Sequence, residues 1–402
     1  MAGLKTYRAK SVRISMQSDQ NAINASPKWF TIPAADCTIK ATENLETINI
    51  VSAGGEPNPT MLNGIEDISG GITFNLQYPL MAWLFGVSIG VATTVTDAAQ
   101  GNWTASTAYT VGEIINGTTP GTDDLVAFQI TGAGKSGLVA PNTTALSDRN
   151  LIVDNQIEWA ARKGALKKYN GALKSCNDFF VVEVVVEADC QVETLYYRKL
   201  GCKVNSLDMN FDKNTGILSA SINVMGSISQ SNIKADGTLD ATYKDLSTIA
   251  GNKEIVLQEE RFVKKGELDF TIDGVASDTV ESFSITIANS LTSKNRLSKT
   301  DGEDTKMIYA ENKKVISGTI SGMFSTVIQG AMDGTSTRPI VISADSEVGD
   351  KFSITLPKAK YSKSEPDFNQ SALMLAPNWN AEPVTGGSAL EYSTTSLSVP
   401  YK

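Results

Sequence analysis

Short segments in which apolar and polar residues alternate recur along the whole chain. Alternation buries one face of a segment and wets the other, which is the pattern of antiparallel β-strands. A near-continuous run of β-branched and aromatic residues, Phe179–Val186, fits a central strand. These patterns predict a mainly β fold, and the clearest alternating segments are Val12–Met16, Leu268–Ile272, Phe283–Ile287 and Phe352–Leu356.

Helical patterns are sparse, and the best candidate is Tyr78–Phe85. Pro79 stands in the expected first turn, where a missing N–H costs nothing. Apolar residues come next, and Gly86 is expected to end the helix.

An internal repeat is the most informative feature of the pattern. Two blocks of sequence return later in the chain in the same order, and each block covers an expected strand and the segment after it. This arrangement indicates a duplicated domain, each copy with a short helix. The first block pairs Ile68–Ile72 with Ile316–Ile320 and, through the helix, Gly86 with Gly334; the second pairs Val184–Asp189 with Ile340–Asp345.

The two blocks match at different offsets, so the first copy carries an insertion between Gly86 and Phe179. Surface loops accept such insertions at low entropic cost. We expect a small β module at 100–165. The chain then divides into a first domain, a module within it, and a linker with a second domain: 1–99 and 166–235, 100–165, and 236–402.

Two polar stretches lack alternation and contain many Ser, Asn, Asp, Gly or Lys residues. Composition of this kind is typical of linkers and long loops. We expect 229–248 to connect the two copies and 289–305 to form a long loop in the second copy.

The net charge of the chain indicates whether nucleic acid is a plausible binding partner. Lys and Arg total 35 against 44 Asp and Glu, for a net charge of −9. A nucleic-acid-binding protein needs a basic face that replaces the counterions of phosphate. This chain has the opposite sign overall, which suits a conduit for DNA better than a binder, and serves solubility equally well.

Catalytic and metal-binding chemistry finds little support. The chain has no histidine, which removes the commonest general base and most zinc sites. Its cysteines lack Cys-x-x-Cys spacing and are expected to be buried free thiols: Cys37, Cys176, Cys190 and Cys202. We therefore expect no enzyme activity, no catalytic residue, no cofactor and no metal.

Membrane partners are not expected either. No apolar run reaches the roughly 20 residues that cross a bilayer. The N-terminal residues show no apolar segment of a secretory signal. We expect synthesis and assembly in a cytoplasm.

The stretch from Ile68 to Gly86 resembles a segment of phage tail tube proteins, in which a glycine-marked strand runs into a short helix ending in glycine. Leu200–Leu207 and Phe352–Pro357 are also similar to that family. The resemblance implies two β-sandwich or barrel tube domains. It also implies a structural virion subunit, assembled in the bacterial host cytoplasm, that forms stacked rings with itself and contacts other tail proteins. Genome DNA would pass through the lumen without specific binding.

Two tube domains in one chain imply three chains in a ring of six domains, with true threefold and approximate sixfold symmetry. The lumen of such a ring is expected to be acidic, because like charge keeps DNA off the wall.

The 100–165 segment resembles a small module common in phage tail and structural proteins, marked by Trp and Tyr. Its candidate interaction residues are Trp103, Tyr109 and Trp159. Their rings could stack on a sugar, or they could form the core of a module too small to fold without large side chains. The first alternative would fit an adhesin or receptor-binding tail protein.

Overall fold

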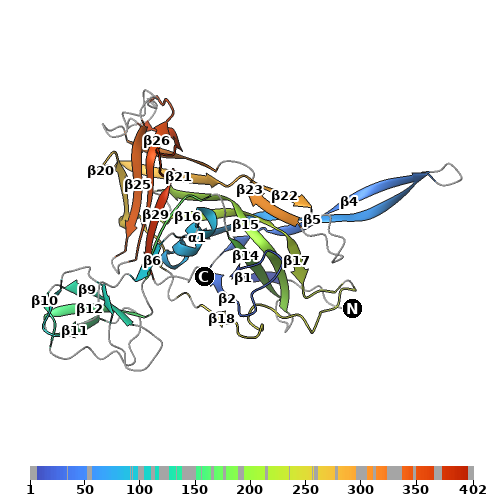
Figure 1. Cartoon of the computed structure of the whole chain (residues 1–402), viewed down its shortest axis with the longest axis horizontal. Coiled ribbons are helices and arrows are strands. Elements are labelled where there is room, and N and C mark those ends of the chain that lie inside the picture. Colours follow the sequence, from blue (N-terminus) through green and yellow to red (C-terminus); the bar gives the residue numbers. More distant parts are fainter. Residues whose placement is uncertain are drawn as a thin grey trace.

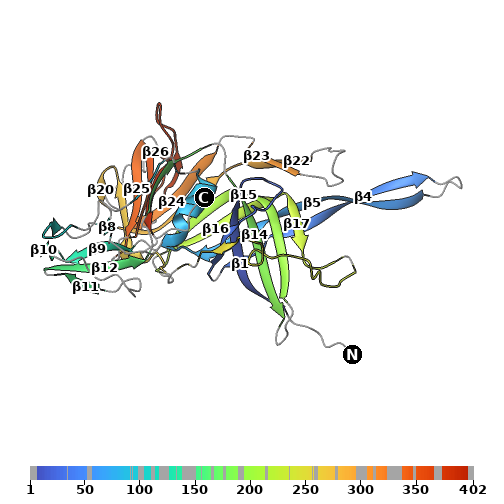
Figure 2. The ribbon, with the colours of Figure 1, turned by 60° about the horizontal axis from the view of Figure 1, so that its bottom comes forward.

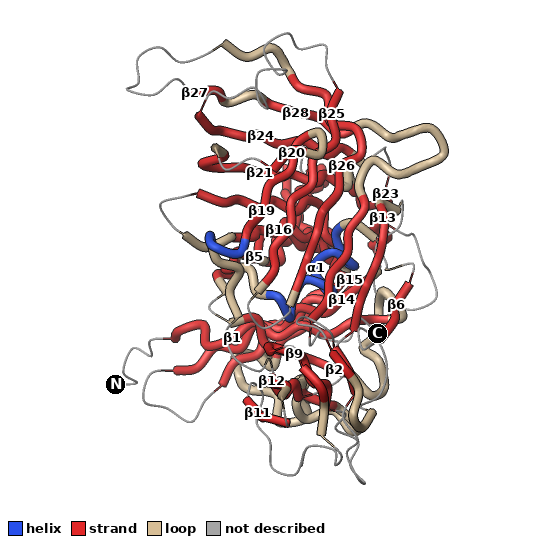
Figure 3. Tube along the Cα trace, turned by 90° about the vertical axis from the view of Figure 1, so that its left-hand side faces the viewer, coloured by secondary structure: helices blue, strands red, loops and turns tan. Residues whose placement is uncertain are grey.

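The computed structural model has a mainly β fold, as expected from the alternating segments, and helical segments are few (Figure 1, Figure 3). The five segments singled out as strands in the sequence all lie in strands. The residues that the structure describes are 7–33, 35–51, 57–90, 92, 94–97, 104–109, 114–116, 126–132, 134–137, 151–154, 156–163, 167–174, 178–188, 194–212, 216–234, 236–255, 257, 261–276, 279–295, 306–310, 314–323, 337–346, 350–365 and 374–396.

The strands fall into three groups along the chain. The first group is β1 (Tyr7–Gln17), β2 (Lys28–Ile32), β3 (Asp36–Cys37), β4 (Lys40–Val51), β5 (Pro57–Asn75), β6 (Thr94–Asp97), β13 (Lys167–Ala172), β14 (Phe179–Ala188), β15 (Thr194–Asp212), β16 (Ser219–Gly226) and β17 (Ile228–Ser231). The group within 100–165 is β7 (Ala108–Tyr109), β8 (Ile114–Asn116), β9 (Val126–Gly132), β10 (Gly134–Lys135), β11 (Leu151–Asp154) and β12 (Ile157–Lys163).

The third group is β18 (Lys253–Glu254), β19 (Leu268–Ile272), β20 (Val275–Ala276), β21 (Val280–Ala288), β22 (Leu291–Asn295), β23 (Lys306–Ala310), β24 (Val315–Met323), β25 (Thr337–Asp345), β26 (Lys351–Tyr361), β27 (Met374–Leu375), β28 (Asn378–Ala381) and β29 (Glu391–Ser396). The described helical segments are η1 (Tyr78–Leu80), α1 (Met81–Ser88) and η2 (Lys265–Glu267).

One order of antiparallel strands occurs twice. In what we call the first sheet, neighbouring strands have the order β1-β14-β15-β16-β5-β4. In the second sheet they have the order β19-β25-β26-β28-β24-β21. A short extra strand lies beside the third member in each case, β17 on β15 and β29 on β26. The repeated order supports the duplication inferred from the sequence.

The strand register confirms the alignment of the first sequence block. Gly70 lies opposite Val224 in the first sheet, and Gly318 lies opposite Trp379 at the same place in the second. The two glycines are therefore equivalent.

The alignment of the second block was wrong. A β-bulge separates Phe180 from Val182 in the β14–β15 pair, and a matching bulge separates Arg338 from Ile340 in the β25–β26 pair. Val182, and not Val184, therefore takes the place of Ile340. A shift by an even number of residues keeps the same side chains on the same face, so alternation alone does not reveal it.

The expected helix is present but extends past Gly86. It opens as the 3-10 turn η1 and continues as α1 to Ser88. The N–H groups of Ile89 and Gly90 both donate to the carbonyl oxygen of Phe85, at 2.8 and 3.1 Å. Every residue of α1 is buried, and a helix that is apolar all round belongs in a core. The helix expected in the second copy, at 328–334, lies outside the described residues.

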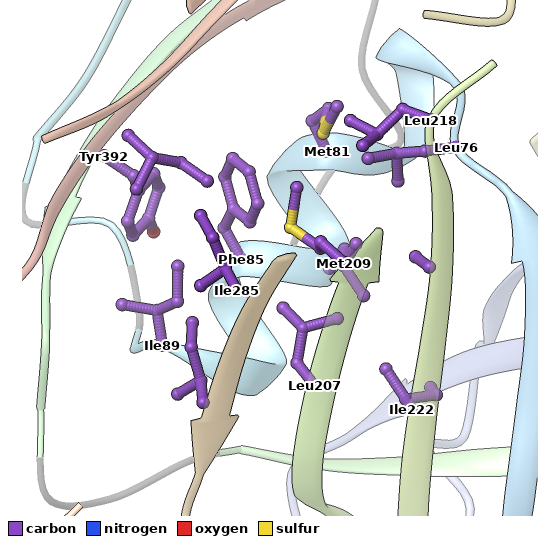
Figure 4. Close-up of a cluster of buried hydrophobic side chains, with 14 of the residues drawn as sticks. Leu76, Met81, Phe85, Ile89, Leu207, Met209, Leu218, Ile222, Ile285 and Tyr392 are labelled. Carbon is purple, nitrogen blue, oxygen red and sulfur yellow. The ribbon is translucent and has the colours of Figure 1, made fainter. Parts of the chain in front are cut away.

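Helix α1 lies in a core shared by both sheets (Figure 4). Trp83 packs edge-on against Phe180 of the first sheet, with ring centroids 5.9 Å apart. On the other side Phe85 packs against Phe352 at 6.2 Å and Tyr392 at 5.3 Å, both in strands of the second sheet. The helix thus joins the two repeats through a common apolar interior.

The polar stretches are more ordered than expected from composition. The stretch at 229–248 begins within β17 and continues through turns in which Asp245 and Leu246 are buried. The stretch at 289–305 begins with β22, which pairs with β23 as a hairpin; residues 296–305 lie outside the described part. Local side-chain hydrogen bonds, such as Thr238 N–H to Asp236 at 2.9 Å, form the turns.

The described strands between 104 and 163 pair only with one another. They form a four-stranded sheet, β11-β12-β9-β8, and a two-stranded one, β10-β7. The flanking strands β6 and β13 pair with each other, with Asp97 opposite Lys167. The chain therefore leaves and re-enters the large sheet at one place, and the module lies at the opposite end from the long β4–β5 hairpin (Figure 1, Figure 2).

Two of the four cysteines lie in the described residues, and both are free thiols. Burial raises the pKa of Cys202 to about 12 and also raises that of Cys37. A thiol with a raised pKa is a poor nucleophile and a poor metal ligand. Cys176 and Cys190 lie outside the described residues.

The tight approach of strands at Gly318 gives a stability prediction. A Cβ atom there would overlap the carbonyl oxygen of Ser284 and the indole of Trp379. Gly318→Ala should therefore lower the free energy of unfolding by about 1–3 kcal/mol. Urea unfolding followed by tryptophan fluorescence measures the change.

Gly266→Ala is the matched control, because a Cβ atom at Gly266 meets no atom within 4 Å. Its unfolding midpoint should stay close to that of the parent protein. Equal midpoints for both variants would show that the close packing at Gly318 is incorrect.

Candidate assembly surface

The outer strand of the second sheet, β21, pairs with the first sheet within the chain, along the part of β15 that extends past β14. Residues 206–212 of β15 pair antiparallel with residues 282–288 of β21. On one face of this junction the Thr286 hydroxyl donates to Asp208 Oδ1 at 2.6 Å. On the other, the rings of Phe211 and Phe283 stack at 5.8 Å. The junction makes the two repeats part of one 21-stranded sheet.

The C-terminal end of α1 is held by residues of the second repeat. Lys314 Nζ donates to the carbonyl oxygen of Ile89 at 3.1 Å. Asn289 Nδ2 donates to the carbonyl oxygens of Ser88 at 3.0 Å and Val204 at 2.8 Å. A cation at this end of a helix also interacts favourably with the helix dipole. These buried contacts fix the second repeat against the first next to the β15–β21 junction.

A buried ionic cluster, which we call the linker clasp, holds the connection between the repeats on the first sheet. Its members are Arg13, Glu183, Arg198 and Asp245. Glu183 is fully buried and accepts from Arg198 Nε at 3.0 Å and Nη2 at 2.6 Å. Arg13 Nη1 donates to Glu183 at 3.3 Å and to Asp245 at 3.1 Å.

The clasp reaches the backbone of the connecting segment as well. The N–H of Leu246 donates to Glu183 Oε1 at 3.1 Å, and Arg198 Nη2 donates to the carbonyl oxygen of Lys244 at 2.7 Å. Burial alone would raise the pKa of Asp245, but hydrogen bonds from Ser247 and the charge of Arg13 bring that pKa below its usual value. The Asp245 carboxylate is therefore charged at neutral pH, and it contacts both Arg13 and the connecting segment.

Aromatic rings enclose the two arginines of the clasp. The guanidinium of Arg13 lies over the Trp29 ring at 4.8 Å, and that of Arg198 lies over the Tyr243 ring at 4.8 Å. Cation–π contacts of this kind gain strength when water is excluded. A small apolar cluster below them completes the attachment of the connecting segment: Trp29, Val181, Leu200 and Leu246.

The first sheet ends in an edge without a described partner strand. Both β3 and β4 pair with β5 on one side, and no described strand pairs with them on the other. We call residues 36–42 the open edge. Asp36, Thr38 and Lys40 are exposed there. Unpaired edges of this length attract other strands unless something covers them.

Of the three residues singled out in the sequence as a candidate interaction site, two lie in described strands of the module. Trp103 lies outside the described residues. Tyr109 is 9% exposed in β7, and its hydroxyl oxygen accepts from the Thr104 N–H at 2.8 Å. Trp159 lies in β12, opposite Ile152 of β11 and Ile130 of β9. The buried, bonded phenol of Tyr109 favours a role in the core of the module over sugar stacking.

The residues that hold the repeats together were not found from the sequence. One signal was present: Glu183 is the single charged residue in the apolar run Phe179–Val186. A carboxylate in a strand buried on both faces requires charged partners, so this run indicates an ionic cluster. Nothing local to Lys314 or Asn289 marks them as contacts of a helix far away in the sequence.

Two further observations concern the described residues as a whole. None of their groups of His, Cys, Asp and Glu is placed to hold a metal ion. None of their helices is long and apolar enough to cross a membrane.

Comparison with known proteins agrees with the resemblance seen in the sequence motifs. The model of a family described as phage tail tube protein matches residues 9–395, nearly the whole chain. A search of curated proteins found no match. The resemblance to that family is confirmed.

The clasp gives a second stability prediction. Glu183→Gln would leave the buried Arg198 and the partly buried Arg13 without the carboxylate between them, which should cost about 3–5 kcal/mol of unfolding free energy. Asp345→Asn is the control, since Asp345 and its partner Lys351 are both more than half exposed and such pairs contribute about 0–1 kcal/mol. Urea unfolding of the two variants should separate them clearly; similar small losses in both would show that the clasp contributes little.

Proposed function

The chain belongs to the phage tail tube protein family, and on that premise we propose that it is a non-enzymatic tube subunit that forms stacked rings. Membership makes it a structural component of a phage tail that assembles with itself and with other tail proteins. The observation that carries the ring proposal is the β15–β21 junction, where the outer strand of one sheet already pairs with the other, equivalent sheet. A closed ring repeats that junction until no edge is left.

Three chains complete such a ring. Each chain supplies two sheets of the same strand order, so three chains supply six, with true threefold and approximate sixfold symmetry. Closure covers every edge and makes a continuous inner barrel. A long curved sheet joined through one internal junction is the shape that this closure requires.

The proposed cargo of the ring is genome DNA in transit. The net charge of −9 disfavours specific binding, because each cationic contact with phosphate would add attraction and slow sliding. We propose an acidic lumen and assembly in the bacterial host cytoplasm before incorporation into the virion.

The proposal extends to the outer parts of the ring. We propose that the domain division is 1–99 with 166–235, 100–165, and 236–402, and that the 100–165 module lies on the outer face of the tube. The linker clasp holds the 229–248 stretch on the first sheet. We therefore propose that the β22–β23 and β4–β5 hairpins, and not this stretch, contact the next ring. The β4–β5 hairpin extends away from the body (Figure 2).

An adhesin acting through the module is the alternative function. It has less support, because Tyr109 is buried with its hydroxyl bonded inside the module. Duplicated sheets joined within one chain have no evident use in an adhesin.

Symmetry tests the ring. We expect electron cryo-microscopy of assembled tubes to show three chains per ring and six similar segments in the wall. Six chains per ring, with residues 251–402 outside the wall, would contradict the proposal.

Removal of the module tests its position. Asp97 and Lys167 lie opposite each other in neighbouring strands, so the chain can be rejoined after residues 100–165 are deleted. The shortened protein should still form tubes, with an unchanged lumen and a smaller outer diameter in negative-stain images. A folded deletion variant that forms no tubes would show that the module takes part in ring formation.

A further inference from the structure

We propose that residues 40–42 of the open edge of one chain pair with residues 363–365 of a second copy, in the register of the β15–β21 junction, and that Lys40 and Glu365 form an ion pair across this contact. This inference rests on the proposed function, because it describes the contact between neighbouring chains of a ring. The template for the contact is a junction that the chain already contains.

The first step is to find the counterpart of β21 in the first sheet. Thr286 lies opposite Ser317 in the second sheet, and Lys40 lies opposite Ser69 in the first. Ser69 and Ser317 each precede the equivalent glycines, Gly70 and Gly318. Lys40 therefore takes the place of Thr286, and the open edge takes the place of residues 282–288.

The second step is to find the counterpart of β15 in the second sheet. Val204 lies opposite Val224, and Tyr361 lies opposite Trp379. Val224 and Trp379 face the two equivalent glycines, so Tyr361 takes the place of Val204.

The same number of residues leads from Val204 to Asp208 as from Tyr361 to Glu365. By this alignment Ser362 takes the place of Asn205, and its N–H donates to the carbonyl oxygen of Asn378 at 2.8 Å. Glu365 is therefore the counterpart of Asp208.

The two steps bring complementary charges together. Within the chain, the carboxylate of Asp208 accepts the Thr286 hydroxyl at 2.6 Å. Between chains, the carboxylate of Glu365 would face the ammonium group of Lys40. Opposite charges directly across an antiparallel pair stabilise it, and like charges destabilise it.

Both side chains are accessible in the single chain. Lys40 is exposed, and Glu365 is 80% exposed, with Lys363 Nζ at 3.8 Å as its partner in the same chain. A pair this exposed holds its members weakly, so Glu365 can exchange it for a contact in the assembly. The apolar face of the edge is supplied by Ile39 and Ala41, which alternate with the polar positions.

The partner of the open edge is a second copy of this chain. The two surfaces are different and belong to different repeats, so their contact is head-to-tail, and a contact of this kind gives a ring when the successive rotations add up to a full turn. The replacement of Thr286 by Lys40 also makes the contact between chains chemically different from the junction within the chain. The contact between chains would thus join two opposite charges, whereas the contact within the chain joins a carboxylate to a hydroxyl group.

Charge reversal provides the first test. Lys40→Glu and Glu365→Lys should each lower the yield of sedimentable tubes about tenfold, because like charges then meet at every contact between chains. The double variant should recover most of the lost yield. Lys351→Glu, which reverses another exposed lysine in an exposed ion pair, should leave the yield unchanged. Circular dichroism should show that all variants are folded.

Cross-linking provides the second test, which is specific for the register. Tubes of the double variant Lys40→Cys and Glu365→Cys should give disulfide-linked trimers on a non-reducing gel after mild oxidation. Lys40→Cys alone is the control for the native cysteines. Tubes without cross-linked chains, or without rescue by the double charge reversal, would overturn this inference and leave the tube function standing. An unmodified protein that never forms rings would overturn the proposed function itself.

Discussion

The backbone groups at the edge of a sheet need partners, and this constraint underlies the architecture of the chain. A single repeat, six strands wide, would leave an edge at each end. Inside the molecule the outer strand of the second repeat, β21, has its partner, because it pairs with the part of β15 that extends past β14. The corresponding edge of the first repeat, at 36–42, has no described partner strand. A subunit built this way is incomplete as a sheet, and assembly with copies of itself completes it.

The contacts away from the edge keep the two repeats in one relative position. The buried helix α1 packs on both sheets, and Lys314 and Asn289 bind the carbonyl groups at its end. The linker clasp holds the connecting segment on the other face of the first sheet. A ring closes only if the rotations at its junctions add up to a full turn, so a rigid internal junction favours assembly.

The sequence was a good guide to the local structure and to the repeat. Alternation located the strands, Pro79 located the start of the helix, and the paired glycines Gly70 and Gly318 aligned the two copies correctly. Alternation has a period of two, so it left the second block misaligned at Val184. The helix continued past Gly86 to Ser88, where Lys314 and Asn289 of the second repeat bind the carbonyl groups at its end. Contacts between distant segments, such as Lys314 with Ile89, have no local signature.

The central claim is that the contact between chains repeats the junction within the chain. Hydrogen–deuterium exchange of the free subunit and of the assembled tube tests it most directly. Amides of β21 should be protected in both states, because β15 already pairs with them. Amides of residues 38–42 that point away from β5 should exchange rapidly in the free subunit and slowly in the tube. Unchanged exchange at 38–42 on assembly would contradict the account.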